Sequence, residues 1–345
     1  MKNLKQLVRP NIWNLKPYSS ARNEFRGEAS VFLDANENPY NEPYNRYPDP
    51  LQWKLKDRIS ELKDIAREHI FLGNGSDEAI DLLIRAFCEP GADNMIAITP
   101  SYGMYEVAAD INNVACVKVP LSDGFRLDAG AALDAAGSNT KLVYLCSPNN
   151  PTGNLLEREE IFRILKYFKG LVVVDEAYID FASSPSLLRG LASYPNLIVL
   201  QTLSKAWGGA GIRLGMAYAS PAIIDILNKI KYPYNVSQLT QEWALRLLNR
   251  QEAMQRELSG ILHERTLVET ALQKLPFVQQ VYPSDANFIL VKVDNPDATY
   301  DYLANKGIIV RNRNTVALCE GCLRITIGTP EQNNLLIKAL QTRTL

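Results

Sequence analysis

Histidine and cysteine are scarce in this 345-residue sequence. The two histidines, His69 and His263, provide little material for a hydrolase triad or a histidine-rich metal site. The five cysteines are odd in number and irregularly spaced, which does not indicate a disulfide framework. The one C-x-x-C pair, Cys319 and Cys322, has no second pair to complete a metal site, so we expect no metal.

Strong net charge and long apolar runs are also absent. Lysine and arginine number 37 and aspartate and glutamate 38, and the formal net charge of -1 gives no basic field for nucleic acid or an anionic membrane. The first 15 residues lack the apolar core of a signal peptide, and no later run approaches membrane-spanning length. We therefore expect a cytoplasmic protein that binds small molecules and has no nucleic-acid or membrane partner.

What the sequence does contain is a regular alternation of strand and helix patterns. Between residues 70 and 219 this alternation predicts a mostly parallel sheet flanked by helices on both faces, an α/β fold. Later strand patterns predict a smaller α+β domain. We expect a large domain over residues 32–245, with an N-terminal arm over 1–31 and a small C-terminal domain over 246–345. Expected elements include helices over 51–66 and 237–273 and strands over 308–311 and 322–327.

The stretch over residues 196–215 carries the most reactive candidate, Lys205. An apolar strand leads into Thr202, Ser204 and Lys205, and then into glycines that allow the backbone to approach a ligand. Burial at a strand end disfavours the ammonium form and favours a nucleophilic amine suited to Schiff-base chemistry. Two hydroxyls and the guanidinium of Arg213 suit a phosphate, so the combination suggests pyridoxal phosphate. An isolated Ser-Lys pair is more often a surface feature, so this hypothesis needs support from other residues.

Polar residues also follow other predicted strands. Two glycines precede Ser76 and Asp77 at a predicted helix start, where unpaired backbone N–H groups form a phosphate cradle. Asp175 ends an apolar strand. A carboxylate there is compatible with a helix cap, but with Lys205 downstream it becomes a candidate partner for a pyridinium nitrogen. Ligands gather at the carboxyl ends of strands in parallel sheets, which favours a shared site.

Two arginines of the predicted small domain, Arg311 and Arg324, lie at or inside apolar strands. Each is compatible with the solvent face of an alternating strand, but two arginines flanking one turn favour an anion site. Nearer the N-terminus, Tyr18 and Asn36 lie in segments rich in proline and polar residues, which predict surface loops that can also line a site. Tyr47 precedes a proline and is therefore extended, so its hydroxyl can project across a subunit interface.

The motifs SPNNPTG, DEAY and TLSK, followed by Arg213, stand in an order that resembles the fold-type I pyridoxal-phosphate-dependent aminotransferases, class II subgroup. The chain looks more closely like the histidinol-phosphate aminotransferase group, since it also carries LKPYSSAR, LDANENP, NRYP, GNGSDE, PSYGMY, GIIVR and CLRITIG. This resemblance spans nearly the whole chain. It implies transfer of the amino group of L-histidinol phosphate to 2-oxoglutarate, which gives imidazole acetol phosphate and glutamate in histidine biosynthesis.

The resemblance also implies the roles of the residues around the cofactor ring. Lys205 would hold the cofactor as a Schiff base and, once freed, carry a proton from the substrate carbon to the cofactor carbon. Asp175 would keep the pyridine nitrogen protonated. Asn150 and Tyr178 would hydrogen-bond the phenolic oxygen of the ring, and Tyr102 would stack on its face. The expected catalytic residues are therefore Lys205, Asp175 and Tyr178.

The remaining expected contacts concern anions. By resemblance, the cofactor phosphate would contact Ser76, Asp77, Thr202, Ser204 and Arg213, with Tyr47 supplied by the partner subunit of a homodimer. The substrate would contact Tyr18, Asn36, Arg311 and Arg324. The sequence departs from the family pattern just after the lysine, where Trp207 and the pair Gly208 and Gly209 replace a smaller aromatic and a bulkier apolar residue.

Two enzymes of the same fold remain open as alternatives, and two other functions are disfavoured or excluded. An aromatic aminotransferase or a threonine-phosphate decarboxylase would use the same cofactor residues, because the choice of bond depends on how the substrate lies over the ring. A non-catalytic protein of this fold is disfavoured by the complete set of chemical residues. A nicotinamide dehydrogenase is excluded, since neither glycine-rich turn completes the G-x-G-x-x-G arrangement.

Overall fold

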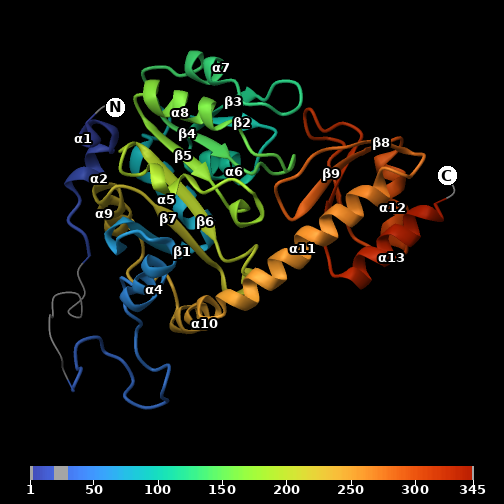
Figure 1. Cartoon of the computed structure of the whole chain (residues 1–345). Coiled ribbons are helices and arrows are strands. Elements are labelled where there is room, and N and C mark those ends of the chain that lie inside the picture. Colours follow the sequence, from blue (N-terminus) through green and yellow to red (C-terminus); the bar gives the residue numbers. More distant parts are fainter. Residues whose placement is uncertain (1–2, 19–29, 344–345) are drawn as a thin grey trace.

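A computed structural model of the chain describes residues 3–18 and 30–343 and contains two sheets (Figure 1). The seven-stranded sheet forms the centre of the larger part, and a four-stranded sheet forms the smaller part. The long helix α11 (Gln251–Leu272) runs from one part to the other. Among the described residues, the helices are all too short or too polar to cross a membrane.

The large sheet is mostly parallel, as predicted. Its strand order is β1-β7-β6-β5-β4-β2-β3. Strand β7 runs antiparallel to both of its neighbours, and the other pairs are parallel. In chain order the strands are β1 (Ile70–Asn74), β2 (Asn94–Thr99), β3 (Ala115–Pro120), β4 (Thr140–Cys146), β5 (Leu171–Asp175), β6 (Leu197–Thr202) and β7 (Leu214–Tyr218).

Helices cover both faces of this sheet because its central strands are apolar on both sides. In β5, Val172 and Val174 join one hydrophobic core, whereas Leu171 and Val173 join the other. One core is shared with α4 (Trp53–Lys63), α7 (Ala129–Asp134), α8 (Arg158–Tyr167) and α10 (Gln238–Leu248). The other is shared with α1 (Leu4–Leu7), α2 (Pro10–Asn14), α5 (Gly75–Phe87), α6 (Met104–Ile111) and α9 (Pro221–Ile230). The predicted α/β fold is confirmed.

The small sheet is antiparallel, with the order β10-β11-β9-β8. Its strands are β8 (Val278–Val281), β9 (Phe288–Val293), β10 (Arg311–Asn312) and β11 (Cys322–Thr326), and its helices besides α11 are α12 (Pro296–Asn305) and α13 (Pro330–Gln341). Ile289 and Val291 pack with the helices, whereas Phe288 and Leu290 join the core of the large part. One face of the small sheet therefore points toward the large sheet.

Several predicted boundaries are wrong in detail. The helix expected over 51–66 spans only Trp53–Lys63, because Gln52 and Asp64 adopt left-handed φ angles of 53° and 50° at its ends. The helix expected over 237–273 is broken between α10 and α11. The strand expected over 308–311 is reduced to Arg311–Asn312. The predicted domain boundary at residue 245 falls inside α10 and remains a prediction. Short 3-10 helices lie at Arg67–His69, Ile179–Phe181, Leu187–Gly190 and Ala210–Ile212.

Candidate active site

A cavity of about 730 Å³ lies where the large sheet and the small sheet meet. Its volume is in the range of small-molecule sites. Most of the site residues that the sequence predicts line this cavity, and they come from segments up to 248 positions apart along the chain (76 to 324). The predicted residues that line it are Ser76, Asp77, Tyr102, Asn150, Asp175, Tyr178, Thr202, Ser204, Lys205, Arg213, Arg311 and Arg324.

The parallel strands explain why these side chains meet. Asp175 is the last residue of β5, and Thr202 is the last residue of β6. Asn150 follows the end of β4 in the SPNNPTG turn, where the amide of Asn149 donates to the carbonyl of Pro100 at 2.9 Å and to Thr152 Oγ1 at 2.8 Å. The carboxyl ends of β4, β5 and β6 lie at one edge of the sheet, which is where ligands bind in such folds.

Asp175 is a buried carboxylate in the cavity wall, and only 2% of it is exposed. The hydroxyl of Tyr105 donates to its Oδ2 at 2.8 Å, and the N–H of Ala177 donates to its Oδ1 at 3.0 Å. Burial nevertheless raises the pKa of Asp175 to about 6, because the lost hydration outweighs these two bonds. An ionised carboxylate held this way is suited to a cationic partner inside the cavity.

Lys205 lines the same cavity as Asp175 and is partly buried. Burial lowers the pKa of its ammonium group, and the positive charge of Arg324 lowers it further. Its Nζ lies 5.3 Å from the centre of the Tyr178 ring. The cavity therefore shifts Lys205 toward the neutral amine, which is the nucleophilic form.

One end of the cavity fits a phosphate group. Helix α5 begins there, and Asn74 makes no side-chain cap at its N-terminus. Gly75 has a left-handed φ of 71°, which favours glycine, and a Cβ atom there would lie 2.7 Å from Arg213 Nη2 and displace this guanidinium. The hydroxyls of Thr202 and Ser204 lie 2.9 Å apart at the same end. A helix start, two hydroxyls and an arginine together match the requirements of a phosphate.

Two tyrosines of the cavity are held as protonated phenols. Burial raises the pKa of Tyr102 and of Tyr178 well above the ordinary value of 10.0. The hydroxyl of Tyr102 donates to Asp77 Oδ1 at 3.0 Å, and the other carboxylate oxygen of Asp77 lies 3.1 Å from Arg213 Nη2. These contacts hold the Tyr102 ring beside the start of α5, where it can cover one face of a flat ligand.

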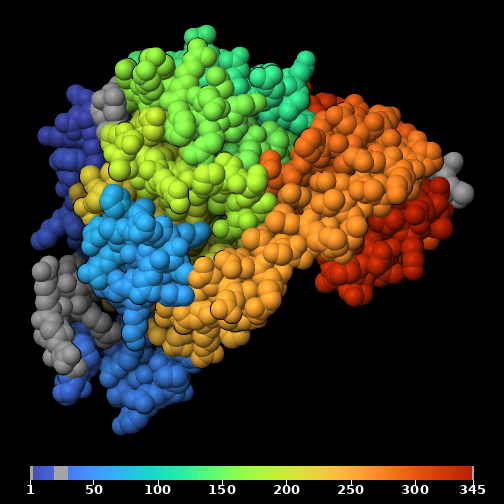
Figure 2. Space-filling model, in the orientation of Figure 1, coloured from blue at the N-terminus to red at the C-terminus, as the bar shows by residue number. Residues whose placement is uncertain are grey.

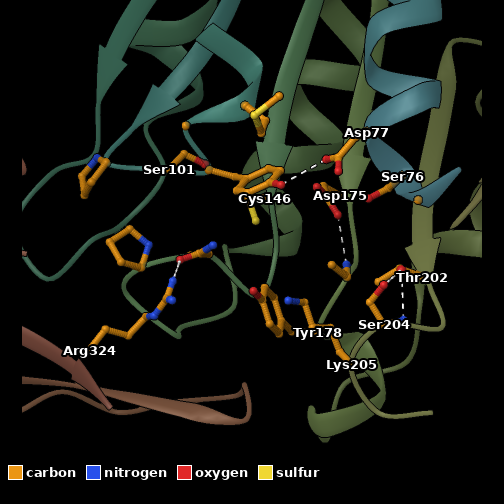
Figure 3. Close-up of a pocket in the computed structure, with 18 of the residues that line it drawn as sticks. Ser76, Asp77, Ser101, Cys146, Asp175, Tyr178, Thr202, Ser204, Lys205 and Arg324 are labelled. Carbon is orange, nitrogen blue, oxygen red and sulfur yellow. Dashed lines mark hydrogen bonds between the residues drawn. The ribbon is translucent and has the colours of Figure 1, made fainter. Parts of the chain in front are cut away.

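The opposite end of the cavity is formed by the small sheet. Arg324 of β11 donates to Asn150 Oδ1, and its guanidinium lies 5.2 Å from the ring centre of Phe288. Figure 3 shows Arg324 on one side of the site, with Ser76, Asp77, Thr202 and Ser204 on the other and Tyr178 and Lys205 between them. The cavity therefore has an anion-binding group at each end and a reactive amine between the ends.

Three nominated residues lie outside the lining of this cavity. The side chain of Tyr18 is 72% exposed, and Asn36 is exposed with a left-handed φ of 54°. Tyr47 is 50% exposed and stacks on Tyr234, with ring centres 4.4 Å apart. Figure 2 shows the segment around residues 31–50 projecting from the large part. The binding roles of these three residues therefore remain predictions, and residues 19–22 of the LKPYSSAR motif lie outside the described residues.

Sequence reasoning missed Tyr105 and Arg313. Tyr105 bonds to Asp175 from α6, and its ring stacks on Tyr144 at 4.9 Å. It lies in the quoted PSYGMY motif, but only the packing of α6 on the sheet brings it to Asp175. Arg313 lines the cavity two residues after Arg311, and a two-residue strand period was a signal for it.

The residues after Lys205 that depart from the family pattern, Trp207, Gly208 and Gly209, lie behind the cavity wall. Trp207 is 5% exposed and joins the hydrophobic core of the large part. The N–H of Gly209 donates to the carbonyl of Leu203 at 2.8 Å, and a Cβ atom on Gly209 would lie 3.0 Å from that same oxygen. The unusual residues therefore shape the turn that presents Lys205 without lining the cavity themselves.

Comparisons of the sequence and of the structure with known proteins all point to aminotransferases. Residues 21–340 match the family model for Aminotransferase class I and II. The chain is 66% identical over 345 residues to histidinol-phosphate aminotransferase of Parabacteroides distasonis, with all of both chains covered. The crystal structure of histidinol-phosphate aminotransferase from Clostridium acetobutylicum matches with a TM-score of 0.80 and 26% identity, covering 86% of this chain and 90% of that chain. The same enzyme of Sinorhizobium meliloti, in complex with pyridoxal-5'-phosphate, matches with a TM-score of 0.78 and 25% identity, covering 86% and 82%.

Proposed function

Because the chain belongs to the aminotransferase class I and II family, we propose that it is a pyridoxal-phosphate enzyme that transfers the amino group of L-histidinol phosphate to 2-oxoglutarate. The products are imidazole acetol phosphate and glutamate, and the reaction serves histidine biosynthesis in the cytoplasm. The observation that carries the proposal is the full-length 66% identity to a histidinol-phosphate aminotransferase. The cavity supports it, since anion-binding groups lie on both sides of Lys205. The family match and the related structures confirm the family, the fold type and the cofactor that the sequence predicts.

The residues in the cavity fit pyridoxal phosphate. The start of α5 with Ser76 and Asp77, together with Thr202, Ser204 and Arg213, would hold the phosphate. The ring would lie beside Tyr102, with its nitrogen at Asp175 and its phenolic oxygen at Asn150 and Tyr178. When bound, this cofactor supplies an electron-accepting ring that stabilises negative charge on the substrate carbon next to the amine.

Lys205 has two functions in this proposal. Its Nζ would hold the cofactor covalently until a substrate amine takes its place. The freed amine of Lys205 would then carry the proton of the adjacent substrate carbon to the cofactor carbon. Both functions require a neutral amine, which is the form that burial and the charge of Arg324 favour.

Asp175 would keep a proton on the ring nitrogen of the cofactor. Its ionised carboxylate would be the hydrogen-bond and charge partner of that N–H, and Tyr105 holds Oδ2 of the carboxylate in place. Tyr105 acts through Asp175 and is therefore a positioning residue. At the other end, Arg311 and Arg324 would bind the substrate phosphate in one half of the reaction and a carboxylate of glutamate in the other.

We expect L-histidinol phosphate alone, without a keto acid, to convert the loaded enzyme from the aldehyde form of the cofactor to its amine form. The reason is that the first half of a transamination needs only the amino donor. The absorption spectrum of the cofactor measures this conversion. L-phenylalanine and O-phosphothreonine serve as parallel substrates.

The other outcomes of this experiment either identify an alternative enzyme or contradict the proposed substrate. Equal conversion by L-phenylalanine would assign the protein to the aromatic aminotransferases. Release of carbon dioxide from O-phosphothreonine would replace the proposal by a decarboxylase. A spectrum that L-histidinol phosphate leaves unchanged would contradict the proposed substrate.

We further propose a homodimer in which Tyr47 reaches the cofactor phosphate of the partner subunit. Tyr47 lies in the projecting segment of Figure 2, outside the cavity of its own chain. Other large apolar side chains of this segment are also exposed, namely Val31, Phe32, Leu33, Tyr40 and Tyr44. A second copy of the chain would cover such a surface.

Tyr47→Phe is expected to weaken cofactor binding by about tenfold, because one hydrogen bond to a charged phosphate is lost. The stack on Tyr234 needs only the ring and is retained. The KM for L-histidinol phosphate should change less than about twofold, since the hydroxyl is assigned to the cofactor phosphate. Cofactor release is measured by dialysis and absorption, with Tyr40→Phe of the same segment as the control. A larger effect on the substrate KM than on cofactor binding would contradict this placement.

A further inference from the structure

The face of the small sheet that points into the cavity carries three arginines rather than two. Arg311 pairs with Arg324 across β10 and β11, and Arg324 pairs with Leu290 of β9, which packs against the large part. The N–H of Arg313 donates to the carbonyl of Cys322 at 2.9 Å, which continues the same antiparallel register. Residues two positions apart in an extended segment share a face, so Arg313 lies on the face of Arg311. All three arginines line the cavity.

The three guanidinium groups repel one another. Burial, together with the neighbouring charges of Arg324 and Arg311, lowers the pKa of Arg313 to about 10. Burial and Arg311 also lower the pKa of Arg324. Within residues 3–18 and 30–343, no carboxylate lies within ion-pair distance of these three groups. Such a group of cations is suited to bind an anion of more than one charge.

Unused donors support the same conclusion. The Nε atoms of Arg313 and Arg324 are buried and have no hydrogen-bond partner among the described residues. A buried donor of a charged group is costly to leave unpaired, which indicates that these side chains are held for a partner that the described residues do not supply. A phosphate monoester presents three acceptor oxygens and close to two negative charges, whereas a carboxylate presents two oxygens and one charge.

We propose that Arg313 is a specificity-determining residue, the third cation of an anion site that favours the doubly charged phosphate ester of the amino donor over the singly charged carboxylate of glutamate. This inference rests on the proposed function and deepens it. Arg311 and Arg324 suffice for a carboxylate. Arg313 adds the charge and the donors that a phosphate ester needs and that a carboxylate leaves unused.

The test compares the two half-reactions in Arg313→Gln, using the loaded enzyme. The KM for L-histidinol phosphate is expected to rise by about tenfold to a hundredfold, which corresponds to the loss of one charge-assisted interaction, while kcat changes little. The KM for L-glutamate should change less than about threefold. Arg313→Lys should recover part of the phosphate affinity, because it keeps the charge. Arg256→Gln, which removes an exposed arginine of α11, is the matched control for loss of one positive charge.

Direct binding of inorganic phosphate to the loaded enzyme separates this inference from the proposed function. Calorimetry should show a weaker phosphate affinity in Arg313→Gln than in the unaltered protein, whatever the amino donor is. Failure of L-histidinol phosphate to react with the unaltered protein would overturn the proposed function and leave this phosphate measurement as the test of the site. An equal loss for both amino donors, a larger loss for L-glutamate, or unchanged phosphate binding would overturn the role of Arg313.

Discussion

Lys205→Ala is expected to lower turnover at least about a thousandfold while the protein remains folded and still binds pyridoxal phosphate. The loss is large because one amine serves both as the attachment point and as the proton carrier, and positioned proton transfer alone contributes ~10²–10⁴-fold. Binding should persist because the groups assigned to the phosphate belong to α5, the end of β6 and Arg213, not to the lysine. Steady-state turnover and cofactor absorption after gel filtration measure the two effects.

Borohydride reduction provides a second measurement for the same variant. Reduction should attach the cofactor covalently to the unaltered chain, with a mass increase at the peptide that contains Lys205. The variant should gain no such mass. Lys169→Ala removes an exposed lysine at the protein surface and is the control that should behave as the unaltered protein does. Near-normal turnover of Lys205→Ala would refute the catalytic assignment.

The chemistry of the site could be predicted from the sequence because it depends on short segments at strand ends. Asp175 and Thr202 are the last residues of adjacent parallel strands, and Lys205 follows three residues later. An apolar run followed by polar residues identifies a strand end, and a parallel sheet brings such ends together. These two signals place the site at this edge of the large sheet.

Other features depend on contacts between distant segments and could not be predicted. The bond from Tyr105 to Asp175 joins residues 70 positions apart and depends on how α6 packs against the sheet. The break between α10 and α11 leaves no Gly or Pro signal at residues 249 and 250. The two-residue strand period relates Arg313 to Arg311, but only the pairing of Arg313 with Cys322 shows that the extended segment reaches residue 313. Tertiary contacts decide each of these cases.

Asp175→Asn is expected to lower turnover about a hundredfold or more and at the same time to stabilise the cofactor-free protein above pH 6. Turnover falls because asparagine cannot supply the charge that keeps a proton on the ring nitrogen. Local hydrogen bonding is preserved, since the amide oxygen can accept from Ala177 and the hydroxyl of Tyr105 can accept from the amide N–H. The variant therefore tests the charge rather than the fold of the site.

The pH dependence of this stabilisation follows from the direction of the pKa shift. Folding raises the pKa of Asp175 from 3.8 to about 6, so the folded protein holds the proton more tightly and loses stability as the pH rises through this window. Above pH 6 the ionised carboxylate costs roughly 3 kcal/mol, which asparagine avoids. Urea unfolding of the cofactor-free proteins should show this difference in the free energy of unfolding at pH 8, and the difference should narrow as the pH falls toward 4.

The control is Asp301→Asn, at an exposed position of α12, which should shift the free energy of unfolding by less than about 0.5 kcal/mol at any pH. A destabilised Asp175→Asn at pH 8 would mean that the carboxylate is stabilising without the cofactor. The structure predicts the opposite, because two hydrogen bonds do not compensate for the burial of the Asp175 carboxylate. This unfavourable charge is retained because it would pair with the cationic ring nitrogen of the cofactor.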